Sequence, residues 1–173
     1  MDAKTTPEYL ISNALNMPDN DALSWKDSSG KWIRSSWSDF YNCTMKMAKS
    51  LIALGFEPGD NLSIYSYNRM EWYAAYAAAN FCNGAAVGVY HTCSPEEVEW
   101  VVGNSDSKVV FVGTDPMDNG DPAKMCTKRL EKAMPSLEKV EAVVSMIGME
   151  SIDHPKAHDW DSFMSIAVSY THL

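Results

Sequence analysis

The sequence predicts an α/β fold in which helices cover both faces of a mostly parallel sheet, with a β-hairpin before it. Short, mainly apolar runs such as Lys108–Gly113 and Val140–Ile147 alternate with longer segments of helical periodicity. Such strands are typical of parallel sheets buried on both faces, and the alternation is typical of strand–helix–strand units. Earlier in the chain, Ala22–Lys26 and Lys31–Trp37 flank the turn-forming segment Asp27–Gly30, which predicts the hairpin.

The first two helices are predicted from their start signals. Thr6 precedes Pro7 and Glu8, so we expect a helix to begin there and to run to about Asn16. Ser38 can cap the second helix by accepting a hydrogen bond from a free backbone N–H. The apolar face of that helix is formed by residues at helical spacing: Phe40, Met47, Ala48, Leu51 and Leu54.

Strands and helices then alternate to about residue 147. Four strands joined by three helices predict an open sheet with right-handed crossovers. The expected elements are the strand Leu62–Tyr67, a helix that Asn68 caps and Gly84 breaks, the strand Ala85–Tyr90, a helix that Ser94 caps and that ends near Gly103, the strand Lys108–Gly113, a helix from about Pro122 to Met134 that Pro135 stops, and the strand Val140–Ile147. Met117–Asp121 and Gly148–Asp161 have the composition of linkers.

The C-terminal end of the chain predicts an incomplete domain. Asp159–Met164 begins like an amphipathic helix, and the sequence ends about one turn later, with no predicted partner for that helix. Residues 168–173 continue no pattern and are interpreted as a candidate non-native tail. We therefore expect residues 1–167 to form one portion of a larger domain.

Composition and charge exclude several classes of function. The 173 residues carry a formal net charge of −9, which argues against binding nucleic acid through its phosphates. The N-terminus lacks the basic and apolar regions of a signal peptide. No cysteine spacing matches a zinc site or a disulfide scaffold, so we expect reduced core thiols at Cys43, Cys82, Cys93 and Cys126. A cytoplasmic or membrane-peripheral protein follows.

One uncharged stretch, Trp72–Tyr90, meets the length criterion for a membrane-spanning helix. It is rich in Ala and Gly, and it contains Asn80 and the helix-breaking pair Asn83–Gly84. A buried helix followed by a buried strand therefore explains it better than a membrane span.

No motif in the chain assigns a catalytic, cofactor-binding or metal-binding residue. Neither G-x-x-x-x-G-K-[ST] nor G-x-G-x-x-G occurs between a strand and a helix. His154 and His158 could suggest a metal site, but Pro155 disfavours a shared helix face, so a solvated loop is the better interpretation.

Two further groups of residues are candidate sites. His91 and Cys93 follow a predicted strand, where open α/β folds bind ligands, but nothing in the sequence orients them for nucleophilic chemistry. A basic stripe at helical spacing could meet a phosphate, although an apolar face on the same helix favours a solvated role for the lysines. The stripe consists of Lys124, Lys128 and Lys132.

The order of several segments resembles the opening of adenylate-forming, AMP-binding enzymes, and most closely the long-chain fatty acyl-CoA synthetase branch, including its bubblegum type. The likeness covers roughly residues 7–165. The segments that carry it are Trp37–Phe40, Ala48–Leu51, Leu54–Asp60, Asn68–Trp72, Asn83–Tyr90, Gly88–Glu97 and Ser105–Val112.

This resemblance implies the first part of the large acyl-CoA synthetase domain. The parent enzyme would activate a fatty acid with ATP and Mg²⁺ to an acyl-adenylate and then transfer the acyl group to CoA. The family's Ser/Thr/Gly-rich loop ending in Pro-Lys and its later motifs do not occur in residues 1–173, so no catalytic residue is carried over. We expect the chain itself to be inactive and to bind none of these cofactors.

Two alternatives remain open at this point. The parent enzyme could act on a different acid, for example an aryl acid, because the residues that line the acyl pocket are expected downstream. The chain could instead be a non-catalytic α/β module that binds a partner or a nucleotide. A sheet with an uncovered edge is also expected to aggregate or self-associate.

Overall fold

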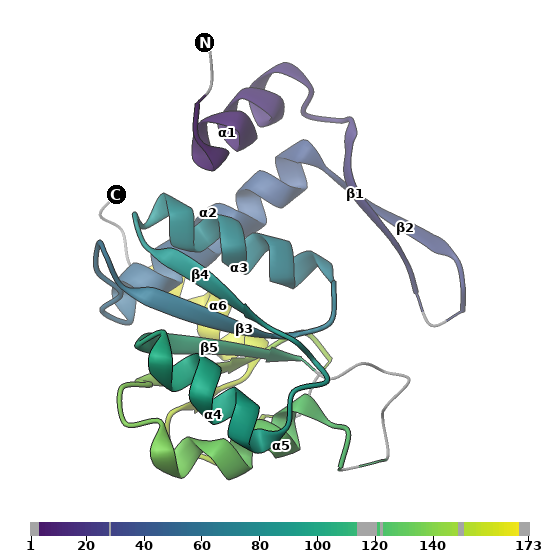
Figure 1. The fold of residues 1–173 in the computed structure, drawn as a ribbon. Coiled ribbons are helices and arrows are strands. Elements are labelled where there is room, and N and C mark those ends of the chain that lie inside the picture. Colours follow the sequence, from purple (N-terminus) through teal and green to yellow (C-terminus); the bar gives the residue numbers. More distant parts are fainter. Residues whose placement is uncertain (1–3, 28, 114–120, 122, 149–150, 170–173) are drawn as a thin grey trace.

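The computed structural model describes residues 4–27, 29–113, 121, 123–148 and 151–169, and five parallel strands form its central sheet (Figure 1). Their order across the sheet is β4-β3-β5-β6-β7. The strands are β3 (Asn61–Ser66), β4 (Ala85–Val89), β5 (Ser107–Gly113), β6 (Ala142–Ser145) and β7 (Ala157–His158). The parallel sheet confirms the predicted fold class.

Helices cover both faces of this sheet (Figure 1). One face packs against α2 (Trp37–Ala53), α3 (Met70–Phe81) and α6 (Trp160–Ser169). The other packs against α4 (Pro95–Asn104), α5 (Cys126–Ala133) and the 3-10 helix η2 (Met134–Ser136). The residues of β3, β5 and β6 are almost all buried, as expected for strands with helices on both sides.

An antiparallel hairpin lies to one side of these layers (Figure 1). It consists of β1 (Asp21–Lys26) and β2 (Trp32–Ser36), as predicted, and it follows α1 (Thr6–Asn16). Asp27 closes the turn, because its carboxylate accepts hydrogen bonds from the backbone N–H groups of Ser29 and Lys31.

Two predicted helix caps are wrong by one or two residues. α1 begins at Thr6, as expected, with Thr5 as its N-cap, whereas Ser36, not Ser38, caps α2. Each true cap has an acidic residue three positions later, so both hydrogen bonds of a capping box form. The predicted cap at Asn68 is also wrong, because the N-cap of α3 is Arg69, which makes no side-chain capping bond.

The second half of the chain contains an element that was expected to be linker. Within Gly148–Asp161, the two residues of β7 add a fifth parallel strand to the sheet. Its position depends on the main-chain bond from the Val143 N–H to the Lys156 carbonyl, a contact that local sequence does not encode.

The helix predicted from Pro122 begins later than expected, at Cys126, because the N-cap Met125 has extended dihedral angles. It ends at Ala133, one residue before the predicted end, and Pro135 lies within the following 3-10 turn. Lys124 consequently precedes α5 and does not belong to a helical stripe.

The final helix corrects a further expectation. α6 contains ten residues and packs against α2, so it does have a partner. Phe163 is fully buried, and its carbonyl accepts a hydrogen bond of 2.8 Å from the hydroxyl of Ser50. Of the proposed tail at 168–173, residues 170–173 lie outside the described residues, as do 117–120 of the polar loop Met117–Asp121.

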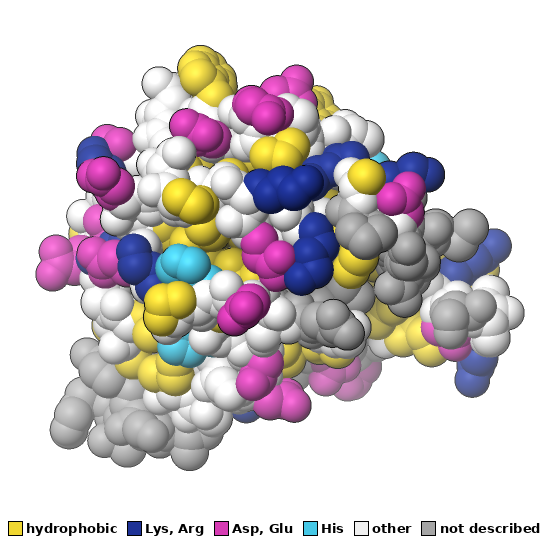
Figure 2. All heavy atoms as spheres, turned by 90° about the horizontal axis from the view of Figure 1, so that it is seen from below, with side chains coloured by type: hydrophobic (Ala, Val, Ile, Leu, Met, Phe, Trp, Pro, Cys, Tyr) yellow, Lys and Arg dark blue, Asp and Glu magenta, His cyan; other side chains and the backbone are white. Residues whose placement is uncertain are grey.

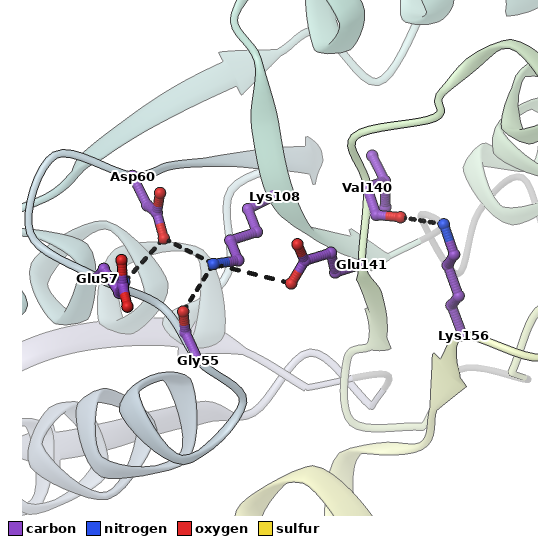
Figure 3. Close-up of polar contacts among 7 residues, drawn as sticks. All are labelled: Gly55, Glu57, Asp60, Lys108, Val140, Glu141 and Lys156. Atoms are coloured by element: carbon purple, nitrogen blue, oxygen red, sulfur yellow. Dashed lines mark hydrogen bonds and ion pairs between the residues drawn. The ribbon is translucent and has the colours of Figure 1, made fainter.

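Polar contacts close the amino-terminal end of the sheet (Figure 3). Lys108 at the start of β5 donates to the carbonyl of Gly55 at 2.7 Å and to the carboxylate of Asp60 at 3.2 Å, and it lies 3.7 Å from Glu141. The hydrogen bond to Asp60 raises the pKa of Lys108. Lys108 is thus held in structural contacts at this end, and open α/β sheets bind ligands at the opposite, carboxyl ends of their strands.

Candidate functional site

The carboxyl ends of β3 and β5 form the switch point of the sheet. From β3 the chain passes through α3 on one face to β4, and from β5 it passes through α5 on the other face to β6. Ser66 and Gly113 are paired where these two strands end. Open α/β sheets bind ligands in the crevice at such a point, so this end is the candidate functional site.

A cleft of about 560 Å³ opens beside this point. Its walls are the segment after β3, the indole of Trp72 on α3, and the end of β4 with Tyr90 and His91. Ser66 and Asn68 add a hydroxyl and an amide to a lining that otherwise consists of aromatic side chains with Gly88 and Val89. The size and the few polar groups are those of a small-molecule pocket.

Hydrogen bonds from β3 and α5 hold the segment that follows β4. The hydroxyl of Tyr65 donates to the carbonyl of Cys93 at 2.9 Å, and Arg129 donates to the carbonyls of His91 and Cys93 at 3.2 and 3.1 Å. Burial raises the pKa of Tyr65, so this hydroxyl keeps its proton and remains a donor. The backbone beside the cleft is therefore fixed by β3 and α5.

A buried ion pair lies on the α3 side of the same end. Arg69 donates to both carboxylate oxygens of Glu71 at 2.9 and 2.6 Å, and to the carbonyl of Ile147 at 2.7 Å. Its Nη1 atom and the hydroxyl of Ser66 are buried without a hydrogen-bond partner among the described residues. A side chain at Gly113 would approach both, with a Cβ at 2.8 Å from Ser66 Oγ and 3.4 Å from Arg69 Nη1.

The residues that form the carboxyl end of the sheet around the cleft are not predicted from the sequence. Arg69 and Glu71 are two positions apart, a spacing that does not bring side chains together on a helix. They meet because Arg69 has extended dihedral angles and stands outside the first turn. Tyr65 and Arg129 are far apart in sequence, so only the tertiary structure shows their shared contact with Cys93.

The structure places His91 and Cys93 as the sequence suggested, at the end of β4, but it does not arrange them for nucleophilic chemistry. Burial, and secondarily the charge of Glu97, raises the pKa of the Cys93 thiol. A thiol with a raised pKa is mostly protonated near neutral pH and is a poor nucleophile.

The four cysteines are free. Cys82 and Cys126 are buried, as expected for core thiols, whereas Cys43 and Cys93 are half-buried. Burial raises the pKa of Cys43 and of Cys82 to about 11.

The two histidines of the C-terminal segment lie outside any helix. His158 belongs to β7, and the Nδ1 atom of His154 accepts a hydrogen bond from the Lys156 N–H. Across the described part of the chain, no group of three His, Cys, Asp or Glu side chains is placed to hold a metal ion.

Two of the three lysines of the predicted basic stripe lie beside an acidic residue. Lys124 lies 3.9 Å from Asp121, and Lys128 binds Glu131 at 2.9 Å. Figure 2, which views the molecule from below Figure 1, shows Lys and Arg scattered among Asp and Glu on the described part of that face.

The uncharged stretch Trp72–Tyr90 divides into α3 and β4, as the sequence predicted. Within the described ranges, none of the helices combines the length and the apolar character that crossing a membrane requires.

Comparison with known proteins identifies relatives for nearly the whole chain. The sequence model described as AMP-binding enzyme matches residues 11–165. The long-chain-fatty-acid–CoA ligase ACSBG2 of Homo sapiens is 27% identical over 165 residues, which are 95% of this chain and 23% of that ligase. ACSBG1 of Rattus norvegicus is 31% identical over 110 residues, which are 63% of this chain and 15% of the relative.

Solved structures share the fold. Coronafacic acid ligase from Pectobacterium brasiliense superposes with a TM-score of 0.74 at 18% identity, over 94% of this chain and 29% of that structure. A putative long-chain-fatty-acid CoA ligase from Rhodopseudomonas palustris gives a TM-score of 0.73 at 20% identity, over 94% and 36%. The chain thus spans less than a quarter of the length of the curated relatives named above.

Proposed function

Because the chain belongs to the family of AMP-binding enzymes, we propose that it is the N-terminal scaffold of a long-chain fatty acid–CoA ligase. The observation that carries the proposal is the match to such ligases over 95% of this chain but only 23% of the human relative. The parent enzyme would activate a fatty acid with ATP and Mg²⁺ to an acyl-adenylate and pass the acyl group to CoA.

The chemistry of that reaction sets what a complete site must contain. A carboxylate is a poor electrophile, and adenylation gives it a good leaving group. Catalysis needs donors and cations placed where charge develops on the transferring phosphoryl group. A metal ion, when bound, would neutralise part of that charge.

The described residues at the carboxyl ends of β3 and β4 do not fit ATP or Mg²⁺. Ser66, Asn68 and His91 supply a hydroxyl, an amide and an imidazole, but no carboxylate faces the cleft. Arg69 is the nearby cation, and it is already bound to Glu71 and to the Ile147 carbonyl. We therefore assign no catalytic step to this chain and propose that its strands and helices form the frame for residues outside it.

ATP–pyrophosphate exchange tests this proposal. The purified chain of 173 residues should show no exchange above a no-protein control, with or without a long-chain fatty acid. The product of the complete reading frame should show exchange that depends on the acid. Exchange by the 173-residue chain alone would overturn the proposed scaffold role.

The same assay also tests which class of carboxylic acid the parent enzyme activates. A panel that contains a long-chain fatty acid and an aryl acid should give faster exchange with the fatty acid, since the curated relatives are named for such substrates. Faster exchange with the aryl acid would retain the ligase and reject the substrate. Absence of exchange with every acid would support a non-catalytic module.

A further inference from the structure

The turn between α3 and β4 is formed by an Asn–Gly pair, Asn83 and Gly84 (Figure 1). Cys82 is the C-cap of α3, and Asn83 after it has a φ of 57°, in the left-handed region. Helices commonly end on such a residue, which is usually Gly and sometimes Asn. Gly84 has to follow, because a Cβ there would lie 2.5 Å from the Asp60 carbonyl oxygen. The shape of the turn therefore allows an Asn directly before an obligatory Gly.

An Asn–Gly pair can lose ammonia spontaneously. The main-chain nitrogen of the Gly, once it has lost its proton, attacks Cγ of the Asn, a C–N bond forms, and the side-chain nitrogen leaves as ammonia. Water then opens the resulting cyclic imide. Cleavage of the C–N bond at Cγ gives Asp, whereas cleavage at the main-chain carbonyl gives isoaspartate, in which the chain continues through Cγ. The net reaction consumes water and releases ammonia, and it needs no oxidant or reductant.

The side chain of Asn83 is open to this reaction. Asn83 is exposed, so water reaches its amide. Its side chain makes no hydrogen bond to any other residue that the structure describes. The residue after it has no Cβ to obstruct the attacking nitrogen. Nothing around the amide itself therefore prevents deamidation.

Main-chain hydrogen bonds instead restrain the attacking group, the nitrogen of Gly84. Its N–H donates to the carbonyl of Ala79 at 2.9 Å, and the carbonyl of Asn83 accepts from the Gly59 N–H at 2.9 Å. These two bonds hold both ends of the peptide group that joins Asn83 to Gly84. To bring the nitrogen onto Cγ, that peptide group must turn about the Cα–C bond of Asn83, which breaks both bonds. The reaction therefore requires this turn to open locally.

We propose that Asn83 is a deamidation site that the folded turn protects, so that conversion follows opening of the turn and then hinders its closure. An isoaspartyl linkage adds a carbon to the main chain, and the close contact of Gly84 with the Asp60 carbonyl leaves no room for it. Both products also add negative charge to a chain of net charge −9. A chain that has unfolded and reacted is thus marked irreversibly. The site does not depend on the proposed ligase reaction.

Peptide mass spectrometry after incubation at mildly alkaline pH, in buffer and in urea, measures the conversion. Asn119–Gly120, the other Asn–Gly pair in the sequence, is the internal standard in urea, where both pairs should react at similar rates. In buffer, Asn83 should react at least about tenfold more slowly than in urea, because only chains with an open turn react. Equal rates of Asn83 in buffer and in urea overturn the protection. A rate at Asn83 far below that at Asn119 in urea overturns the site.

Urea concentrations below the unfolding transition test the opening step itself. The deamidation rate at Asn83 and the hydrogen-exchange rate of the Gly84 amide should rise by the same factor, since both require the bond to Ala79 to break. A deamidation rate that stays constant while the Gly84 amide exchanges faster contradicts the proposed restraint.

Asn83→Gly is the matched variant for the consequence of the reaction. It removes the reacting amide, and Gly adopts the left-handed region freely. After long incubation in urea and dilution into buffer, the unmodified chain should lose refolding yield in proportion to conversion at Asn83, whereas Asn83→Gly should keep its yield. Both proteins retain Asn119, so conversion there affects them equally. Equal losses of yield in the two proteins overturn the proposal that the conversion hinders closure of the turn.

Discussion

Gly84 lies where α3 ends and the chain turns back beside β3. Its N–H donates to the carbonyl of Ala79, and the next N–H, of Ala85, donates to the carbonyl of Asp60 at 3.1 Å. A Cβ at Gly84 would lie 2.5 Å from that Asp60 carbonyl oxygen and 2.6 Å from the ring of Phe56. Only glycine fits, because the first of these neighbours is backbone.

Replacing Gly84 with Ala should destabilise the chain by about 1–3 kcal/mol, since the backbone must shift to relieve the overlap. Gly103→Ala is the matched control. Gly103 is in α4, and its Cβ would meet nothing closer than 3.8 Å, so that change should stabilise the chain by about 0.5–1 kcal/mol. Urea unfolding of both variants measures this. A neutral Gly84→Ala would contradict the close contact.

At the scale of single residues, the sequence predicts the type of residue that caps a helix more accurately than the position of that cap. The cap at Ser94 is correct: Pro95 follows it directly, and Glu97, three positions later, completes a capping box. Ser38 is wrong, since the acid that completes a capping box with Ser36 is Asp39. Nothing in the local sequence indicates that Arg69 would take the N-cap position in place of Asn68.

The start of α3 contains a buried ion pair, and its arginine also binds the loop after β6. The side chains of Arg69 and Glu71 are 14% and 6% exposed, and Arg69 also binds the carbonyl of Ile147. Removing one member of a buried pair leaves the other charge without compensation, which costs more than the pair itself contributes. The junction therefore depends on both residues together.

Arg69→Met should lower the free energy of unfolding by about 3 kcal/mol, and adding Glu71→Leu should recover much of that loss. Arg34→Met is the control, because the Arg34–Asp21 pair is largely exposed and should change stability by no more than about 1 kcal/mol. Chemical denaturation of the unmodified chain, the two single variants and the double variant measures these free energies of unfolding. A double variant less stable than Arg69→Met would contradict the account.

Elements with a strong period are predicted well, and elements defined by tertiary contacts are not. The parallel strands β3 to β6 agree with the sequence to within two residues at each end because they are mainly apolar. β7 is missed, since two residues carry no periodicity. The partner of α6 is missed as well, because the Ser50 hydroxyl that binds the Phe163 carbonyl lies more than a hundred residues away.

For the whole molecule, the sequence predicts a parallel sheet but not the order of its strands. That order places the ends of β3 and β5 at the switch point, and it leaves β4 at an edge. The sequence places His91 and Cys93 at the end of a strand without assigning a site to them, and the walls of the cleft at Ser66 and Trp72 come from other elements. These residues become neighbours only through the crossover connections of the sheet, and local sequence does not predict that pattern.

Sequencing of the transcript that encodes this chain, beyond the codon for Leu173, tests most directly the claim that the chain is the scaffold of a larger ligase. The account predicts that the reading frame continues into a Ser/Thr/Gly-rich loop that ends in Pro-Lys. A stop codon directly after Leu173 in the native transcript would contradict it.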